Sequence, residues 1–267
     1  MRANVTSRFA PTVLKGGGMG FIELQRSEGI ATLTLSRGKV NALNGAVVDQ
    51  LRGTLKTLEG DPEVKAIILT GAGKFFSFGF DVPEFLSVTK EQFTEYLTSF
   101  TELYTYIFLY PKPIVAALNG HTIAGGCMLA LACDYRVMVS GKAKISLNEI
   151  GFGSSVFSGS VEMLRFWVGG ANATAILFSG AMYTAEEAKT LGLVQEVVTE
   201  GEIKDVADKV ASDFASKYPP AFASIKSLLR KNIAKEMRNQ ERDSIKEFVD
   251  IWYSESTWAN LKDIKIQ

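Results

Sequence analysis

One carboxylate and two glycine-containing turns have the residue types needed for proton-transfer chemistry. Glu149 lies in an otherwise apolar stretch and could act as a general base. Gly125 and Gly126 open a small-residue segment, and the first N–H groups of a helix starting there suit an anion or a developing oxyanion. A loop N–H near Phe80 could be the second donor of an oxyanion hole. The residues alone leave two alternatives open: the glycines only ease packing, and Glu149 is a surface or salt-bridged residue.

Three other polar residues compete for a catalytic role, and we expect structural roles for them. Asp81 is expected to cap or brace its own loop. Asp134 follows a predicted helix and is expected to pair with a backbone group or with Arg136. His121 lies in a strand-to-helix turn and is expected to pack or to form a hydrogen bond.

Buried parallel strands must place the two turns side by side. The short, almost fully apolar runs at residues 66–70 and 114–118 predict such strands, and ligands of α/β sheets bind beyond the carboxyl ends of the strands. A glycine-rich loop at 71–82 follows the first run, and an Asn-Gly turn follows the second. Alternating residues at 21–25 and 30–35 predict a β-hairpin. Further expected elements are helices over 47–58, 93–107 and 125–132 and a strand over 135–139.

The pattern changes from alternating strands and helices to mostly helices after about residue 155. The expected helices cover residues 161–167, 171–178, 185–191, 202–217, 219–235 and 240–252, with one strand at 193–198. We therefore predict an α/β fold with a helical C-terminal region. The expected organisation is a flexible lead-in at residues 1–20, an α/β core at 21–200 and a helical, oligomerising region at 201–267.

Composition narrows the class of protein. The 267 residues include 29 Lys and Arg and 29 Asp and Glu, so a basic excess for nucleic-acid binding is missing. The sequence contains no run of about 18 apolar residues, so no membrane-spanning helix is expected. Residues 1–20 lack the apolar centre of a signal peptide. Cys127 and Cys133 have a spacing that matches no common zinc site, so no metal is expected. A reducing cytoplasm is the expected location.

Four segments together resemble the crotonase (enoyl-CoA hydratase/isomerase) superfamily, from about residue 20 to 260. Residues 76–81 (FSFGFD) resemble the family's F-S-A-G-x-D loop, and residues 119–127 (NGHTIAGGC) resemble its N-G-x-x-x-G-G-G-C turn. Residues 37–44 (RGKVNALN) resemble its R-P-x-x-x-N-A-L segment, one residue shorter and without the proline. Residues 184–194 (TAEEAKTLGLV) resemble its T-A-x-E-A-x-x-x-G-L-V segment. The four occur in the family's order.

The resemblance implies a crotonase-like ββα spiral core and a role for each matching residue. The N–H groups of Phe80 and Gly125 would hold the carbonyl oxygen of an acyl-CoA thioester, and Glu149 falls on a catalytic carboxylate position. The remaining residues would border the coenzyme A and acyl channel: Lys39, Ala42, Ser77, Phe78, Gly79, Asp81, Gly126 and Met128. Tyr218 to Ala221 and Lys226 lie where relatives contact coenzyme A.

One departure from the family pattern favours isomerisation of a 3-enoyl-CoA over hydration. Hydratases of this family have a second glutamate directly after Gly-Gly-Cys, where this chain has Met128. A thioether cannot act as a general base or hold water strongly. A single carboxylate suffices to move a proton from C2 to C4. The residues around Met128 and Glu149 also resemble the Δ3,Δ2-enoyl-CoA isomerase branch. Ala124, which stands where the triple glycine begins, is expected to matter little.

Other functions stay open. Within the family, the chain could be a hydratase or another crotonase-type lyase or hydrolase. A non-catalytic acyl-CoA-binding protein is a different class, and the presence of Glu149 argues against it. The resemblance implies no cofactor, because coenzyme A belongs to the substrate. It also implies a homotrimer or a dimer of trimers, without nucleic-acid or membrane partners.

Overall fold

The computed structural model describes residues 12–13 and 20–264 of the chain. The flexible lead-in predicted for residues 1–20 therefore lies outside the described residues, except for residues 12, 13 and 20. Within the described part, no helix is both long enough and apolar enough to cross a membrane.

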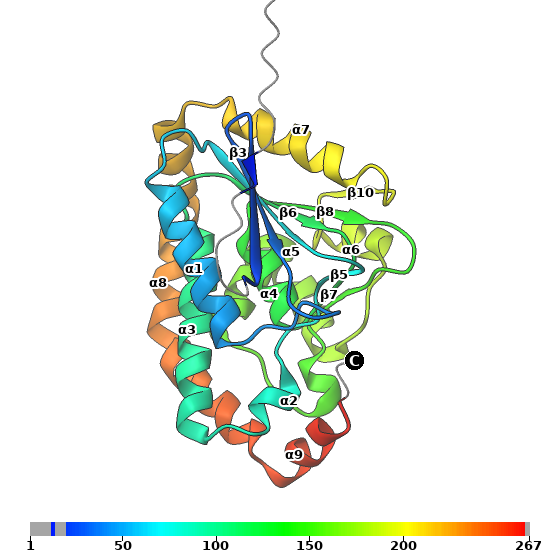
Figure 1. Cartoon of the computed structure of the whole chain (residues 1–267). Helices are drawn as coiled ribbons and strands as arrows, with labels where there is room; N and C mark the ends of the chain where they lie inside the picture. The colour runs from blue at the N-terminus through cyan, green and yellow to red at the C-terminus, as the bar shows by residue number, and fades with distance from the viewer. Residues whose placement is uncertain (1–11, 14–19, 265–267) are drawn as a thin grey trace, which may run out of the picture.

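A sheet of seven strands lies at the centre, with the order β1-β2-β3-β4-β6-β8-β10 (Figure 1). The first three strands pair antiparallel, which includes the predicted hairpin, and the pairs from β3 to β10 are parallel. The strands are β1 (Thr12–Val13), β2 (Ile22–Ser27), β3 (Ile30–Leu35), β4 (Ala66–Gly71), β6 (Ile114–Leu118), β8 (Tyr135–Val139) and β10 (Glu196–Val198). As predicted from their apolar runs, β4 and β6 are adjacent.

A second, three-stranded parallel sheet continues the chain beyond the carboxyl ends of the first. It is formed by β5 (Phe75–Ser77), β7 (His121–Ile123) and β9 (Ile145–Ser146), in that order. The segments of β5 and β7 were predicted as loop and turn, and β9 was not predicted, since two or three residues are too few to show an alternating pattern. Each follows a strand of the large sheet and precedes a helix. This repeat of strand, strand and helix is the predicted ββα spiral core.

Two glycines form the corners between the sheets. A Cβ on Gly71 would lie 2.2 Å from the carbonyl oxygen of Phe75, and one on Gly120 would lie 2.0 Å from the carbonyl oxygen of Lys74. No side chain fits at such distances. The two glycines therefore let β4 and β6 turn into β5 and β7.

Helices cover the sheets and form most of the C-terminal region (Figure 1). The long helices α3 and α8 run side by side, and α7 packs on β3, β4 and β6. The helical elements are α1 (Gly45–Glu59), α2 (Val82–Phe85), α3 (Lys90–Leu109), α4 (Gly125–Ala132), the 3₁₀ turn η1 (Glu149–Phe152), α5 (Ser158–Ser179), α6 (Ala185–Leu191), α7 (Ile203–Ala215), α8 (Pro219–Trp252) and α9 (Glu255–Lys262).

Three details of the C-terminal helices differ from the sequence prediction. The helices predicted over 219–235 and 240–252 are one helix, α8, because the polar turn between them carries the buried Met237 and so continues the apolar face. The helices predicted over 161–167 and 171–178 are joined in α5 across a kink at Gly169, whose φ is 74°. Helix α9 was not predicted, because its eight residues carry only two buried side chains, Thr257 and Leu261.

Candidate active site

The loop between β5 and α2 is fixed by backbone hydrogen bonds to the segment at residues 40–43. The N–H of Phe78 donates to the carbonyl of Val40 at 3.0 Å, and the N–H of Leu43 donates to the carbonyl of Gly79 at 2.8 Å. The hydroxyl of Ser77 donates to the carbonyl of Asn41 at 2.8 Å. Among the described residues, none accepts a hydrogen bond from the N–H of Phe80. The loop is therefore rigid and presents one free amide.

The turn before α4 presents further free amides. Ala124 has a φ of 48°, uncommon for a residue other than glycine, and its carbonyl accepts from the N–H of Met128 at 3.0 Å. The N–H groups of Gly125, Gly126 and Cys127 have no acceptor in the described part of the chain. They form the positive end of a wholly buried helix.

The loop and the turn touch each other. A Cβ on Gly79 would lie 3.1 Å from the amide nitrogen of Gly125, and one on Gly126 would lie 2.5 Å from the carbonyl oxygen of Ser77. A Cβ on Gly125 would lie 2.8 Å from Cε1 of the Phe80 ring. The glycines thus do allow close packing, and they also bring the free amide of Gly125 beside the loop that carries the free amide of Phe80.

Glu149 is the buried carboxylate of this region. Its side chain is only 3% exposed, and its Oε2 atom has no hydrogen-bond partner among the described residues. Burial raises the pKa of Glu149 to about 8. The alternative of a surface or salt-bridged glutamate is therefore wrong. A carboxyl group with a pKa near neutrality and one oxygen free to accept a proton has the properties of a general base.

A cavity of about 360 Å³ brings Glu149 together with the two turns. Its walls include Glu149, Phe80 and Ala124, from three segments that are distant in the sequence. The other residues along the cavity are mostly apolar: Phe78, Val82, Ile123, Asn148, Gly151, Phe152, Gly180, Phe248, Trp252 and Ile264. Its size and lining suit a small apolar chain with one polar end.

Aromatic side chains close one side of this cavity. The Phe80 ring makes edge-on contacts with Tyr96 and Phe100 of α3, at centroid distances of 5.3 and 4.9 Å. Phe248 and Trp252 of α8 also line the cavity. The sequence reasoning missed these two α8 residues, because no motif surrounds them. Their spacing of four on an amphipathic helix marked them only as core.

The other predicted channel residues differ in exposure. Lys39 is exposed, whereas Ala42, Ser77, Gly79 and Gly126 are buried. Met128 is also buried, in the second turn of α4, and it does not line the cavity. Only Phe78 and Phe80 of the loop reach the cavity walls. The structure thus brings the predicted residues into one region, but not all of them line the cavity that contains Glu149.

Asp81 has the predicted structural role. Its carboxylate accepts from the N–H of Glu84, which caps α2, and pairs with Arg37 at 2.7 Å. Arg37 also donates to the carbonyl of Ala42 at 3.2 Å, so it connects this loop to the segment at residues 40–43.

Asp134 has one of its two predicted partners, whereas the expectation for Lys226 requires a correction. Asp134 accepts from the backbone N–H of Ile114, as predicted, but its charged partners are Lys226 at 2.7 Å and Arg230 at 3.0 Å, not Arg136. The two cations extend from α8 to Asp134, while Arg136 lies over the ring of Trp167. Lys226 is 5% exposed and bound in this ion pair, so it is not available to the phosphates of coenzyme A.

His121 and the cysteines have structural environments. The His121 ring lies 5.1 Å from the ring of Phe75, in agreement with packing. Cys127 and Cys133 are free and buried, and burial raises the pKa of both thiols. Within residues 12–13 and 20–264, no group of three or more His, Cys, Asp or Glu side chains is placed to hold a metal ion.

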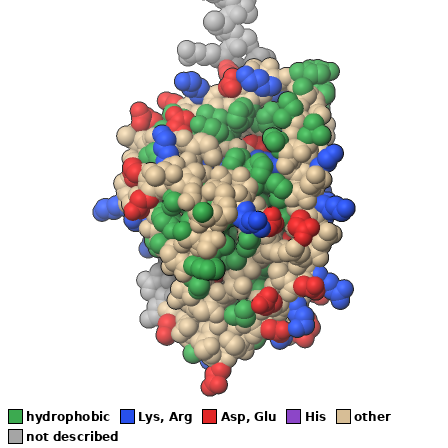
Figure 2. Space-filling model, turned by 180° about the vertical axis from the view of Figure 1, so that it is seen from behind, with side chains coloured by type: hydrophobic (Ala, Val, Ile, Leu, Met, Phe, Trp, Pro, Cys, Tyr) green, Lys and Arg blue, Asp and Glu red, His purple; other side chains and the backbone are tan. Residues whose placement is uncertain are grey.

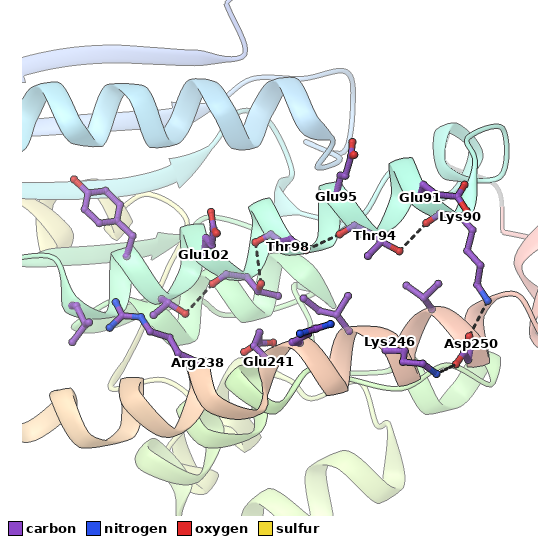
Figure 3. A pocket seen from close by; sticks show the side chains of 17 residues that line it. Lys90, Glu91, Thr94, Glu95, Thr98, Glu102, Arg238, Glu241, Lys246 and Asp250 are labelled. Atoms are coloured by element: carbon purple, nitrogen blue, oxygen red, sulfur yellow. Dashed lines mark hydrogen bonds and ion pairs between the residues drawn. The ribbon is translucent and has the colours of Figure 1, made fainter.

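A large groove lies away from this region, between α3 and α8 (Figure 3). It has a volume of about 1070 Å³, and charged side chains such as Glu102 and Lys246 lie along it. Glu241 contributes to this groove and accepts a hydrogen bond from the Tyr104 hydroxyl at 2.7 Å. None of the predicted site residues lines it, so it is not the candidate site.

Comparisons with known proteins agree with the predicted family. Residues 25–257 match the family described as "Enoyl-CoA hydratase/isomerase". Over 79% of its length, the chain is 31% identical to the "Short-chain-enoyl-CoA hydratase" of Clostridium acetobutylicum, covering 81% of that protein. It is 29% identical to "Enoyl-CoA delta isomerase 1, mitochondrial" of Mus musculus, over 90% of this chain and 84% of the relative.

A solved structure shows the same fold. The human mitochondrial Δ3-Δ2-enoyl-CoA isomerase superposes with a TM-score of 0.87 and 26% identity, over 91% of this chain and 96% of that one. The relatives are named both as hydratases and as isomerases. All of these relatives are enzymes. The chain is therefore a member of the enoyl-CoA hydratase/isomerase family, which is also called the crotonase superfamily.

Proposed function

We propose that this enzyme is an enoyl-CoA isomerase, which converts a 3-enoyl-CoA into the 2-enoyl-CoA. One observation carries the proposal: Glu149 is a single buried carboxyl group in a cavity that also contains the Phe80 loop, and its Oε2 atom has no hydrogen-bond partner among the described residues. The position that holds the second carboxylate of the hydratases is occupied by Met128. The site thus has one group for proton transfer.

The reaction follows from these groups. The thioester oxygen accepts hydrogen bonds from the N–H groups of Phe80 and Gly125, which have no other acceptor among the described residues. Glu149 takes a proton from C2, and the electron pair of that C–H bond forms a dienolate whose charge rests mainly on the thioester oxygen. The same carboxyl group returns the proton to C4. The double bond moves from C3–C4 to C2–C3, and no atom is gained or lost.

Hydration of a 2-enoyl-CoA is the second candidate, because several relatives are named as hydratases. That reaction adds water across the double bond and requires a group to hold and deprotonate the water. Met128 has a thioether in place of a carboxylate and is 1% exposed. The proposal therefore ranks isomerisation above hydration.

The proposal also covers the cofactor requirement, the binding of coenzyme A and the cellular location. The reaction needs no cofactor, since coenzyme A enters as part of the substrate. Lys39, which is exposed beside the buried Ala42, is proposed to meet the coenzyme A portion at the mouth of the site. Two free, buried cysteines support a reducing cytoplasmic location.

The proposed assembly is a homotrimer or a dimer of trimers. Exposed apolar side chains support it, and such side chains gather in patches on the face shown in Figure 2. Separately, four exposed apolar side chains lie near the start of α8. These four are Tyr218, Ile225, Leu228 and Leu229, each at least 59% exposed. Sedimentation equilibrium measures the assembly, and a monomer at micromolar concentration would contradict it.

Glu149→Gln is expected to lower the rate of isomerisation by about 10²–10⁴, because loss of a general base has this cost. The substitution keeps the size of the side chain, so binding of coenzyme A and the melting temperature are expected to change little. Turnover of 3-hexenoyl-CoA measures the effect. Glu241→Gln, which changes a half-buried glutamate away from the cavity, is the matched control and is expected to keep its activity. Full activity of Glu149→Gln would contradict Glu149 as the general base and would mean that another group takes the proton.

The value of kcat/KM for isomerisation is expected to rise with pH and to level off above about 8. Burial raises the pKa of Glu149 to about 8, so the free enzyme holds a protonated, inactive carboxyl group below that value and a carboxylate above it. The measurement is a pH–rate profile from pH 6 to 9, with circular dichroism at each pH as the control for folding. A flat profile over this range contradicts Glu149 as the base.

Isomerisation of 3-hexenoyl-CoA is expected to be faster than hydration of 2-hexenoyl-CoA, because the second carboxylate is missing. The two rates are compared on the same enzyme preparation. Met128→Glu is expected to raise hydration if its carboxylate is oriented toward water, and Met128→Gln is the uncharged control for the change of shape. Faster hydration than isomerisation in the unmodified enzyme would refute the assignment.

A further inference from the structure

The C-terminal end of the buried helix α4 is capped by side chains from outside the helix. The last four carbonyls of a helix have no partner within it. In α4, each of these carbonyls is approached by a side-chain donor. The donors are Cys133 Sγ to Leu129 O at 3.4 Å, Arg136 Nη1 to Ala130 O at 3.3 Å, Trp167 Nε1 to Leu131 O at 2.7 Å and Arg230 Nη1 to Ala132 O at 3.5 Å.

Three of these donors form one stacked group from three different elements. The guanidinium carbon of Arg136, on β8, lies 3.9 Å from the centroid of the Trp167 ring, and that of Arg230, on α8, lies 5.3 Å from it. Trp167 itself belongs to α5. We call Arg136, Trp167 and Arg230 the α4 clamp. It connects the C-terminal end of α4 to a strand and two helices.

The clamp carries an excess of positive charge. Asp134 lies 3.0 Å from Arg230 and also pairs with Lys226. Arg136 is fully buried, and none of the described residues forms an ion pair with it; it donates instead to the carbonyls of Ala130, Cys133 and Leu193. Burial lowers its pKa to about 10, so the guanidinium stays charged at neutral pH. A buried charge without a carboxylate is costly, and packing alone does not require it.

The positions of the clamp and of the free amides on α4 are complementary. The clamp binds the carbonyls at one end, while the amides of Gly125, Gly126 and Cys127 remain free at the other. The eight residues of α4 separate the two ends by about 12 Å, at a rise of about 1.5 Å per residue. Cations at the C-terminal end neutralise the negative pole of the helix, which would otherwise oppose negative charge at the N-terminal end.

We propose that Arg136, Trp167 and Arg230 are positioning residues for the oxyanion hole, because they fix α4 and make its N-terminal end more positive. This inference rests on the proposed function, in which Gly125 donates to the thioester oxygen. The clamp touches no substrate atom. It acts through the helix, so its removal weakens the hydrogen bonds to the enolate more than it weakens binding of the ground-state thioester.

The test measures the polarisation of a bound carbonyl. Butyryl-CoA with ¹³C at its thioester carbonyl binds without reacting at a double bond, and its infrared carbonyl frequency falls when the oxygen accepts strong hydrogen bonds. The variants are Arg136→Met, Arg136→Lys and Trp167→Phe. The last keeps an aromatic ring, removes the donor to Leu131 O and reduces the ring on which the two guanidinium groups stack. Arg165→Met is the matched control, because Arg165 lies on α5 near Trp167 but pairs with Glu162 at the surface. Each variant is also assayed for kcat, KM and melting temperature.

Arg136→Met is expected to lose at least half of the carbonyl shift and about tenfold in kcat, with KM changed less than threefold. Arg136→Lys is expected to recover most of both, and Trp167→Phe to lose part of both. The control is expected to match the unmodified enzyme. If Arg136→Met does not fold, Trp167→Phe and Arg136→Lys still decide the question. Folded variants that keep the full carbonyl shift and kcat would overturn the positioning role of the α4 clamp. Absence of a shift in the unmodified enzyme would instead overturn the oxyanion hole of the proposed function.

Discussion

The burial of α4 is the constraint on which the site depends. All eight of its residues are buried, and its first three N–H groups have no acceptor in the described part of the protein. Buried amides without partners cost free energy comparable to lost hydrogen bonds. The structure meets the same demand at the other end of the helix, where four side-chain donors reach the last four carbonyls. Only the end beside the cavity is left unsatisfied.

The ββα repeat creates this arrangement. Each large-sheet strand that continues into the small sheet directs the chain toward one region, and Gly71 and Gly120 allow the change of direction. The loop of Phe80 and the turn of Gly125 are therefore neighbours although they are 45 positions apart in the sequence. Glu149 follows the third such strand pair, β8 and β9, and reaches the same cavity. Phe248 and Trp252 of α8 line this cavity, and burial of Glu149 raises the pKa of its carboxyl group.

The sequence predicts the parts of this protein that depend on local patterns. Apolar runs identified β4 and β6 as neighbouring parallel strands, and the motifs identified the Phe80 loop, the α4 turn and Glu149. Elements that depend on distant contacts were missed. The strands β5, β7 and β9 are two or three residues long and exist because the chain folds into a spiral. Likewise, the sequence predicted a backbone group or Arg136 as the partner of Asp134. The backbone partner is confirmed, but the ion pair with Lys226, which is 92 positions away, was missed.

The central claim is that two backbone amides bind the thioester oxygen and that Glu149 works beside them. A crystal structure with a bound, non-reacting acyl-CoA such as butyryl-CoA tests it most directly. The account predicts distances of about 2.7–3.1 Å from the thioester oxygen to the amide nitrogens of both Phe80 and Gly125, with the Glu149 carboxyl group facing C2. A thioester oxygen held elsewhere, or bound by only one of the two amides, would contradict it.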